Sequence, residues 1–224
     1  MIEVTILQIF NISIKSSLTE FFFAPYLDYS PSQIFLESIA AFFGIASVLY
    51  SRINNVLVFP TGLISTLIYV YLLWQFELLG DMIINAYYFL MSIYGWYYWT
   101  RKREEKIRYP VTQSTPNDLK IAIILFLLTV VFITIVYSIF NKWDNVTSIV
   151  DTITTGIFFV GMWLMARRKI ENWFFWIVGD LISIPLYFYK GLTISSLQYI
   201  IFTFLAALGY LQWKRHYLNK TAIL

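Results

Sequence analysis

Residues 172–198 read NWFFWIVGDLISIPLYFYKGLTISSLQ, and the interpretation of the whole chain starts from this stretch. It has the length and apolar character of a membrane-spanning helix, but it carries one carboxylate between aromatic rings. A helix with 3.6 residues per turn places side chains at i, i+3, i+7, i+10 and i+14 on one face. The side chains at these positions are Trp173, Trp176, Asp180, Ser183 and Tyr187. The stretch therefore predicts a membrane helix with one polar and aromatic face.

The carboxylate of Asp180 is costly at the middle of such a helix. Insertion scales place the cost of a central Asp at about 2.5 to 3.5 kcal/mol. A charged side chain is kept at that depth where its helix face looks onto a cavity, a substrate or a partner helix. No Lys or Arg lies at a comparable depth in any predicted span, so a structural ion pair is the weaker interpretation. Asp180 is the first candidate functional residue.

Composition assigns the chain to the membrane proteins. Of its 224 residues, 59% are hydrophobic and 20% aromatic, only 13% are charged, and the mean hydropathy is +0.67. A soluble domain carries roughly a quarter of charged residues. Cysteine is absent, and the only histidine, His216, lies outside the predicted spans. This excludes disulfides, thiol chemistry, haem ligation and histidine proton relays, and we expect no metal, no cofactor and no nucleic-acid partner.

Seven stretches have the length of a membrane span. They lie near residues 33–51, 54–74, 80–99, 119–140, 147–166, 172–189 and 193–213. Residues 3–23 are interrupted by polar side chains, which favours an N-terminal helix at the membrane interface over a spanning one. We expect an all-α integral membrane protein.

The distribution of Lys and Arg predicts the orientation. In a model with seven spans, one side holds Arg52, the run 101–108, Arg167, Arg168, Lys169, Lys214, Arg215 and Lys220. The other side holds Lys15, Lys142 and Lys190. The basic side is expected to be cytoplasmic, so the N-terminus lies outside and the C-terminus inside.

The first three and last three spans resemble each other. The matched positions are Gly44 with Gly161, Asn55 with Asn172, Gly62 with Gly179, Gly95 with Gly209, and Trp99 with Trp213. Two repeats of three spans, joined by one more span, have the same orientation in the membrane, which is a 3+1+3 arrangement of parallel repeats. Asp180 has no acidic counterpart, because Leu63 stands at the equivalent position.

This interpretation divides the chain into five segments. They are an N-terminal interfacial segment at 1–32, a first three-helix repeat at 33–100, a cytoplasmic loop and linker helix at 101–146, a second three-helix repeat at 147–216, and a C-terminal tail at 217–224.

Several of these residues also resemble a known family. The run NWFFW at 172–176, the following VGD at 178–180, IPLY at 184–187 and Gln198 closely resemble the PnuC nicotinamide riboside transporters. The first-repeat stretch NAYYFLMSIYGWYYW at 85–99 is similar to another part of the same family. The resemblance covers residues 33–216 and leaves the N-terminal thirty residues uncovered.

The resemblance implies a bacterial inner-membrane protein with a SWEET-like 3+1+3 fold that forms a homotrimer in the lipid bilayer. It would take up nicotinamide riboside for NAD synthesis by facilitated diffusion, with cytosolic phosphorylation trapping the substrate. Relatives on similar scaffolds carry thiamine or riboflavin, which stay open as alternatives.

Such a substrate combines a flat cationic pyridinium with a carboxamide and ribose hydroxyls. Aromatic faces and a carboxylate suit the cation, at about 0.5 to 2 kcal/mol for each cation–π contact. Asp180, Trp173, Trp176 and Tyr187 supply these groups, and Gln198, Asn85 and the Tyr88 hydroxyl supply directional hydrogen bonds.

Each candidate also has a structural interpretation. Trp173 and Trp176 near a helix start are equally typical of an interfacial aromatic belt, and Gln198 and Asn85 of amides that bridge helices. Trp96, Trp99 and Trp213 stand beside basic residues, which favours belt positions for them. Glu37, one turn into the first span, is expected to be interfacial or structural.

The sequence argues against an enzyme and against a non-transporting scaffold. The chain lacks the GxxxxGK[ST] signature of a P-loop, so it is not expected to hydrolyse ATP. It also lacks HExxH and GxSxG motifs, and nothing in the sequence places Asp151 and Asp180 together, which argues against an intramembrane enzyme. A non-transporting scaffold gains nothing from burying Asp180. A membrane transporter is therefore the favoured function, and no catalytic residue is assigned.

Overall fold

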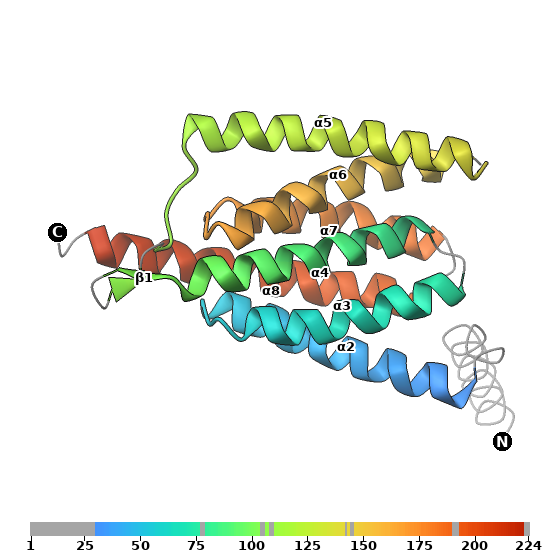
Figure 1. The fold of residues 1–224 in the computed structure, drawn as a ribbon, viewed down its shortest axis with the longest axis horizontal. Coiled ribbons are helices and arrows are strands. Elements are labelled where there is room, and N and C mark those ends of the chain that lie inside the picture. The colour runs from blue at the N-terminus through green and yellow to red at the C-terminus, as the bar shows by residue number, and fades with distance from the viewer. Residues whose placement is uncertain are drawn as a thin grey trace, which may run out of the picture.

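The structure is a computed structural model that describes residues 30–76, 79–103, 106–107, 110–141, 143, 146–189 and 193–221. Almost all of the predicted N-terminal interfacial segment lies outside the described residues. The described part contains seven helices and one short hairpin (Figure 1). The helices are α2 (Pro31–Arg52), α3 (Val58–Gln75), α4 (Leu79–Thr100), α5 (Pro116–Ile139), α6 (Val146–Ala166), α7 (Asn172–Tyr189) and α8 (Thr193–Thr221), and the strands are β1 (Lys102–Arg103) and β2 (Lys106–Ile107).

Each predicted span coincides with one of these helices. Four of them, α2, α3, α5 and α6, are long and apolar enough to cross a membrane by length and composition. The main difference from the sequence prediction is the length of α8. It continues to Thr221, so residues 217–221 of the expected tail are helical.

Local sequence signals set two of the helix starts. Ser30 and Gln33 form a capping box before α2, and Thr115 and Asp118 form one before α5. In each case a proline follows the cap and occupies the start of the helix, where its missing N–H costs nothing. These residues determine where α2 and α5 begin.

The helices pack as two consecutive groups with α5 outside them. Within the groups, α2 contacts α3, α3 contacts α4, α6 contacts α7, and α7 contacts α8. The groups meet where α4 packs on α6 and α2 packs on α8, and α5 lies along α6 (Figure 1). A central space is therefore enclosed by six helices, and α5 is left at the edge.

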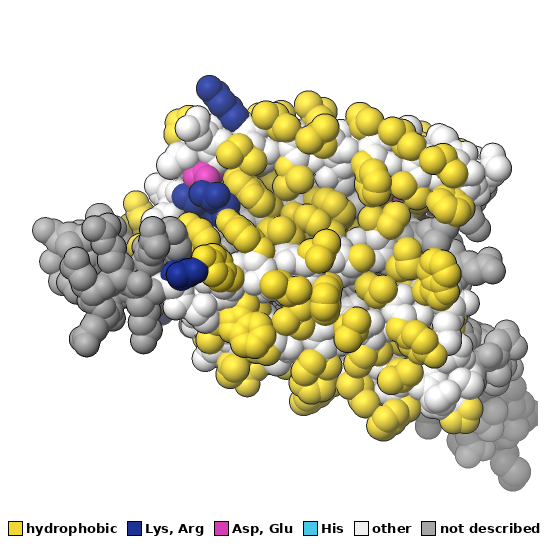
Figure 2. Space-filling model, in the orientation of Figure 1, with side chains coloured by type: hydrophobic (Ala, Val, Ile, Leu, Met, Phe, Trp, Pro, Cys, Tyr) yellow, Lys and Arg dark blue, Asp and Glu magenta, His cyan; other side chains and the backbone are white. Residues whose placement is uncertain are grey.

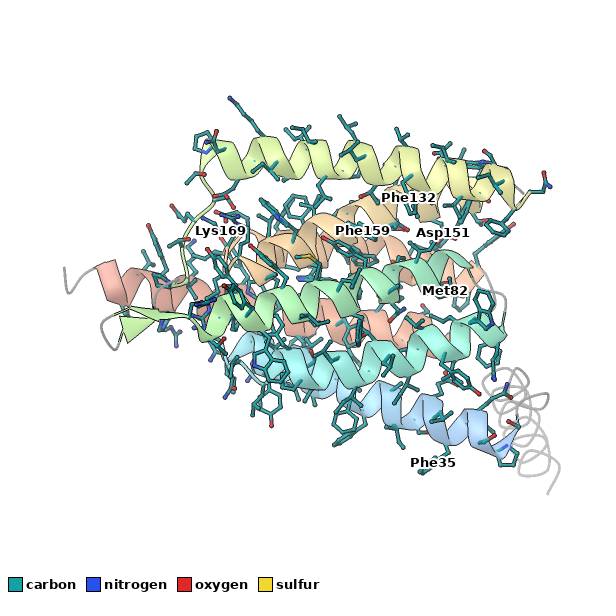
Figure 3. All side chains as sticks on the ribbon, viewed as in Figure 1. Phe35, Met82, Phe132, Asp151, Phe159 and Lys169 are labelled. Atoms are coloured by element: carbon teal, nitrogen blue, oxygen red, sulfur yellow. The ribbon has the colours of Figure 1, made fainter. Side chains whose placement is uncertain are left out.

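One end of the bundle, called the basic end below, gathers Lys and Arg side chains. It holds the ends of α2, α4 and α6, the start of α5, and the loop between α6 and α7 that carries Lys169 (Figure 3). Figure 2 shows Lys and Arg confined to this side of the visible face, while hydrophobic side chains cover the rest. Many of these apolar side chains are exposed, such as Leu128 on α5 at 62%. That surface is suited to lipid, which agrees with the membrane assignment.

A strap formed by residues 110–115 ties the start of α5 to the α6–α7 loop. The backbone N–H of Thr112 donates to the carbonyl oxygen of Arg168 at 3.1 Å, and the N–H of Ile170 donates to the carbonyl oxygen of Thr112 at 3.0 Å. Lys169 forms an ion pair of 2.9 Å with Asp118, which is 4% exposed. Arg168 lies over the ring of Trp99 at 4.1 Å, and burial lowers the pKa of its guanidinium to about 10, which leaves it charged at neutral pH.

Candidate functional site

A cavity of about 680 Å³ lies inside the bundle. Its wall is built by α2, α3, α4, α6, α7 and α8, while α5 contributes none of the lining residues. The seven side chains predicted from the sequence all line this cavity. They are Asn85, Tyr88, Trp173, Trp176, Asp180, Tyr187 and Gln198.

Asp180 lies on the cavity wall and is 3% exposed. Among the described residues it has no hydrogen bond or ion pair, and no Lys, Arg or His lines the cavity. The structural explanation, in which the carboxylate binds a polar group of another helix, is therefore not supported within the described part of the chain. A buried carboxylate without a cation is costly, so it favours a cationic ligand.

Two more polar groups on the same face of α7 lack hydrogen-bond partners in the described structure. The hydroxyl of Ser183, which is 1% exposed, and the indole N–H of Trp173, which is 2% exposed, both lie at the cavity wall. Buried polar groups are almost always satisfied in proteins, by protein, water or ligand. One helix face thus presents an acceptor and two further polar groups to the cavity.

Aromatic rings form the walls beside Asp180. The ring of Trp176 meets Tyr88 edge-on at 5.7 Å and lies against Phe158 at 5.7 Å. Tyr199 stacks with Phe158 at 6.2 Å and lies 4.9 Å from Tyr187. These rings come from α4, α6, α7 and α8. Together they form an apolar wall, and the partial negative charge on aromatic faces suits a flat ligand.

Trp173 lies deeper than Trp176, in an aromatic cluster at the basic end of the cavity. Its ring meets Trp213 edge-on at 5.6 Å, and Trp213 lies 5.9 Å from Trp99. The indole N–H of Trp99 donates to the carbonyl oxygen of Ala166 at 3.0 Å, and that of Trp213 donates to Ser51 at 2.9 Å. These contacts join both helix groups at this end of the cavity, where Trp173 is part of the wall.

The prediction of interfacial belt positions for Trp99 and Trp213 is wrong. Their exposed fractions are 4% and 1%, whereas Trp96 is 41% exposed. The basic neighbours that suggested a belt stand on the same helix ends, but Trp99 and Trp213 turn toward the bundle axis. Trp173 is likewise buried inside the bundle and is no belt residue.

Asn85 and Tyr187 both form a hydrogen bond with Asp81. The Asn85 side-chain nitrogen donates to the carbonyl oxygen of Asp81 at 2.9 Å, one turn earlier in α4, so this bond does not bridge two helices. The Tyr187 hydroxyl donates to the Asp81 carboxylate at 2.7 Å and connects α7 with α4. Asp81 therefore fixes Tyr187 at the cavity wall, a role that the sequence analysis did not assign.

Three carboxylates on the wall were missed as site residues. Glu37, Asp81 and Asp151 line the cavity toward the end opposite the basic end, where α2, α4 and α6 begin (Figure 3). The prediction that Glu37 is interfacial or structural is therefore replaced by a cavity position. The fold also brings Asp151 and Asp180 to one cavity, although no sequence signal joined them. The sequence signal that could have identified these three carboxylates is that they lie inside predicted spans without basic residues at the same depth.

Gly179 makes room for the aromatic wall. A Cβ at this position overlaps the ring of Phe158, whereas a Cβ at Gly161 lies 3.3 Å from Phe175 and 3.5 Å from Trp176. Overpacking a core costs about 1 to 3 kcal/mol. We expect Gly179→Ala to lower the free energy of unfolding by about that amount, measured by thermal unfolding of the detergent-solubilised protein. The matched variant Gly161→Ala requires only a small shift of Phe175 and should lose clearly less stability than Gly179→Ala. Equal losses in both variants would contradict the assignment.

Comparison with known proteins identifies the family of the chain. A sequence model of the family described as nicotinamide mononucleotide transporter matches residues 34–215. The nicotinamide riboside transporter PnuC of Escherichia coli is 23% identical over 208 residues, covering 80% of this chain and 84% of that protein. PnuC of Neisseria mucosa is 26% identical over 196 residues, covering 81% and 74%. The riboflavin/roseoflavin transporter RibM of Streptomyces davaonensis is 26% identical over 144 residues, covering 61% and 65%.

A solved structure has the same fold. The crystal structure of the vitamin B3 transporter PnuC superposes with a TM-score of 0.63 at 20% identity, covering 94% of this chain and 90% of that one. The matched family and the named relatives are transporters, which agrees with the transporter function and argues against an enzyme. The resemblance noted from NWFFW and its flanking residues is confirmed, because the matched region spans nearly all of the described helices. The chain belongs to the nicotinamide mononucleotide transporter family, together with the PnuC transporters.

Proposed function

We propose that this protein carries nicotinamide riboside across the bacterial inner membrane. The observation that supports this most directly is Asp180, a buried carboxylate without a cation, on the wall of an aromatic cavity. The pyridinium ring of the riboside is flat and positively charged. It would meet the faces of Trp176 and Tyr88, and its charge would complement Asp180. The site residues are thus Asp180, Trp173, Trp176, Tyr187, Gln198, Asn85 and Tyr88.

The remaining groups of the substrate need hydrogen bonds. The Gln198 side chain, the Tyr88 hydroxyl and the Asn85 side-chain oxygen can bind the carboxamide and the ribose hydroxyls. Ser183, which lacks a partner within the described chain, adds one more donor on the face of α7 that carries Asp180. These groups orient a ligand that the aromatic rings hold.

The charge of the cavity favours the riboside over its phosphate ester. Glu37, Asp81 and Asp151 give the half of the cavity away from the basic end a negative potential, which attracts cations. A phosphate needs Lys, Arg or backbone N–H donors, and no basic side chain is among the lining residues. The cavity therefore suits the dephosphorylated cation better than the mononucleotide.

The proposal includes the finer architecture of the transporter. The groups α2–α4 and α6–α8 would be parallel three-helix repeats of a SWEET-like 3+1+3 fold, with α5 as the linker helix between them. Their contact at α4–α6 and α2–α8 supports a rocking motion of one repeat against the other. With the basic end in the cytoplasm, the N-terminus is periplasmic and the C-terminus cytoplasmic.

Transport would proceed by facilitated diffusion with alternating access. Cytosolic phosphorylation would then trap the substrate, and the lipid-facing surface would leave room for a homotrimer. In this orientation the cluster of Trp99, Trp173 and Trp213 lies at the cytoplasmic end of the cavity, where the substrate would be released.

Riboflavin is the second candidate, because the relative RibM is named as a riboflavin transporter. Its flat ring system also fits aromatic walls, but it is uncharged and gains nothing from Asp180. Thiamine is a cation, so Asp180 alone does not separate it from the riboside.

The three vitamins are separated by isothermal titration of the purified protein in detergent. We expect nicotinamide riboside to bind at least tenfold more tightly than thiamine or riboflavin. Nicotinamide mononucleotide is the matched control for charge, since it differs by one phosphate, and it should also bind more weakly. Tighter binding of thiamine or riboflavin would contradict nicotinamide riboside as the substrate and would not affect the description of the fold.

A further inference from the structure

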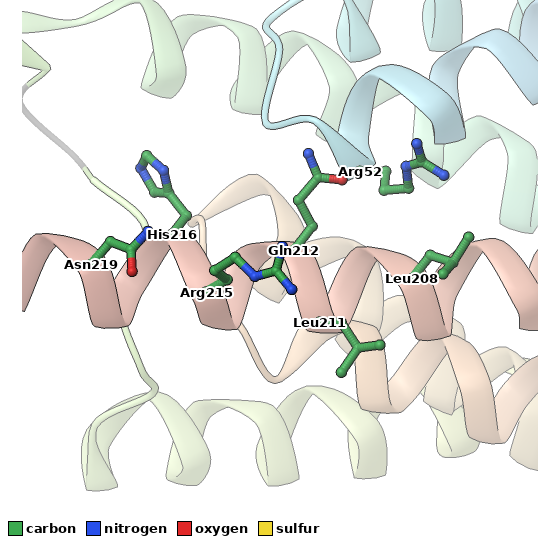
Figure 4. A pocket seen from close by; sticks show the side chains of 7 residues that line it. All are labelled: Arg52, Leu208, Leu211, Gln212, Arg215, His216 and Asn219. Atoms are coloured by element: carbon green, nitrogen blue, oxygen red, sulfur yellow. The ribbon is translucent and has the colours of Figure 1, made fainter.

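A second cavity lies at the basic end of the bundle, and it shares no lining residue with the cavity that contains Asp180, called the transport cavity here. It has a volume of about 510 Å³ and sits between the end of α2 and the second half of α8. In Figure 4, Gln212 and His216 rise from α8 on the side where the end of α2 carries Arg52. The hydrogen bond from the Trp213 indole to the Ser51 carbonyl oxygen, at 2.9 Å, holds the two helices together beside it. We call this cavity the basic groove.

The charges of the basic groove are not balanced by the described protein. Its wall includes Arg52, Arg215 and His216 and no acidic residue. The Nε atom of Arg52 is buried and has no hydrogen-bond partner in the residues that the structure describes. An uncompensated guanidinium with a buried donor favours an anionic ligand with oxygen acceptors.

Other cations at the same end have partners. Lys169 and Arg167 both pair with Asp118, at 2.9 and 3.7 Å. Arg168 lies over Trp99, and Lys214, the neighbour of Arg215, lies over the ring of Tyr210 at 5.6 Å. The Nε atoms of Arg167 and Arg168 are also buried without a hydrogen-bond partner among the described residues, but these two guanidiniums have a carboxylate or an aromatic ring beside them. Within the same part of the chain, no carboxylate lines the basic groove.

The position of the basic groove along α8 gives its depth in the membrane. At about 1.5 Å per residue, the 29 residues of α8 are about 43 Å long, which exceeds the ~30 Å hydrocarbon core. The part that extends beyond the core carries Arg215 and His216. Leu208 and Leu211 lie one to two turns earlier in the same groove, and Leu211 is 61% exposed. Charged groups at headgroup level thus stand directly above apolar groups at acyl-chain level.

We propose that the basic groove binds an anionic membrane phospholipid. Its phosphate would lie between Arg52 and Arg215, with Gln212 and His216 as further donors, and an acyl chain would follow Leu211 and Leu208. A free phosphate would use the same cationic groups but gains nothing from the two leucines. The apolar rim therefore favours the lipid.

The test is native mass spectrometry of the full chain in detergent, titrated with phosphatidylglycerol and, separately, with phosphatidylcholine. We expect phosphatidylglycerol to bind more tightly. The double variant Arg52→Gln/Arg215→Gln should bind it at least tenfold more weakly, since each basic residue contributes about fivefold to the affinity for anionic lipid. The control Arg101→Gln/Lys214→Gln removes the same charge outside the groove and should bind like the wild type.

Folding and alternative occupants are distinguished in the same experiment. Arg52→Lys/Arg215→Lys keeps both charges and should retain most of the binding, and the double glutamine variant should still bind nicotinamide riboside. Equal phosphatidylglycerol binding by the glutamine variant and the wild type would overturn the proposal. Displacement of the lipid by inorganic phosphate at constant ionic strength would reassign the groove to a soluble anion. Loss of subunits from an oligomer in the glutamine variant, with lipid binding unchanged, would reassign it to an interface between copies.

Discussion

Replacing Asp180 with Asn is expected to weaken nicotinamide riboside binding by about two orders of magnitude. A unit charge about 4 Å from the pyridinium contributes up to about 4 kcal/mol at an effective dielectric constant of about 20, and two orders of magnitude correspond to about 2.7 kcal/mol. Asn keeps the shape of the side chain and removes its charge. Isothermal titration of the purified variant measures the loss directly.

The stability of the empty variant separates this effect from misfolding. Asp180 has no ion-pair partner within the described structure, so removing its charge removes a desolvation cost. The melting temperature of Asp180→Asn without substrate should equal or exceed that of the wild type. Unchanged riboside affinity would eliminate the proposed role of the carboxylate. A lowered melting temperature would show instead that Asp180 stabilises the fold.

Replacing Asp118 with Ala is expected to have the opposite pattern, with a large loss of stability and little change in substrate affinity. Asp118 accepts from the backbone N–H and the hydroxyl of Thr115 at 2.9 and 2.8 Å, and it pairs with Lys169 at 2.9 Å. Removing one partner of a buried ion pair costs about 3 to 5 kcal/mol because the other charge stays buried. Since Lys169 is 8% exposed and retains a bond to the Gln113 carbonyl oxygen, we expect about 3 kcal/mol.

Thermal unfolding in detergent measures this loss, and Lys120→Ala, two residues later in α5, is a suitable control because Lys120 is exposed. The riboside dissociation constant of Asp118→Ala should lie within about threefold of the wild type, since no atom of the strap lines the transport cavity. A stable Asp118→Ala variant would mean that the strap of residues 110–115 does not depend on this ion pair. A large change in affinity would mean that the strap controls the cavity.

The helical part of the fold was predictable because the membrane imposes simple rules on sequence. Spans must be apolar and about 20 residues long, and charges gather outside them. The end of α8 was placed too early because hydropathy falls where the helix leaves the bilayer, while its hydrogen bonds continue to Thr221. Hydropathy indicates whether a segment is surrounded by lipid or by water, and it does not indicate where the helix ends.

The candidate site was predictable to the extent that its residues share a helix face. Trp176, Asp180 and Tyr187 stand on α7 at helical spacing, and the structure brings all three to the cavity. Glu37, Asp81 and Asp151 come from three other helices, and only packing shows that they face the same space. Their individual positions near span ends are equally typical of interfacial residues.

Trp99 and Trp213 are residues for which the sequence pattern predicted the wrong location. Both stand next to basic residues, a pattern that in sequence indicates an interfacial ring, yet both are buried and donate to backbone carbonyl oxygens of other helices. The rotation of a helix about its axis decides between lipid and bundle interior. That rotation depends on contacts with neighbouring helices and is not encoded in the local pattern.

The sequence by itself determined the membrane class, the approximate places of the helices, the basic end and the polar face of α7, because each follows from local composition and helical period. Only the tertiary structure decided that six helices enclose one cavity, that four carboxylates and no basic residue line it, and that tryptophans from three helices form one cluster at its basic end. The reason is physical: the cost of burying Asp180 can be read from one helix, but what lies opposite its carboxylate depends on the packing of all the others.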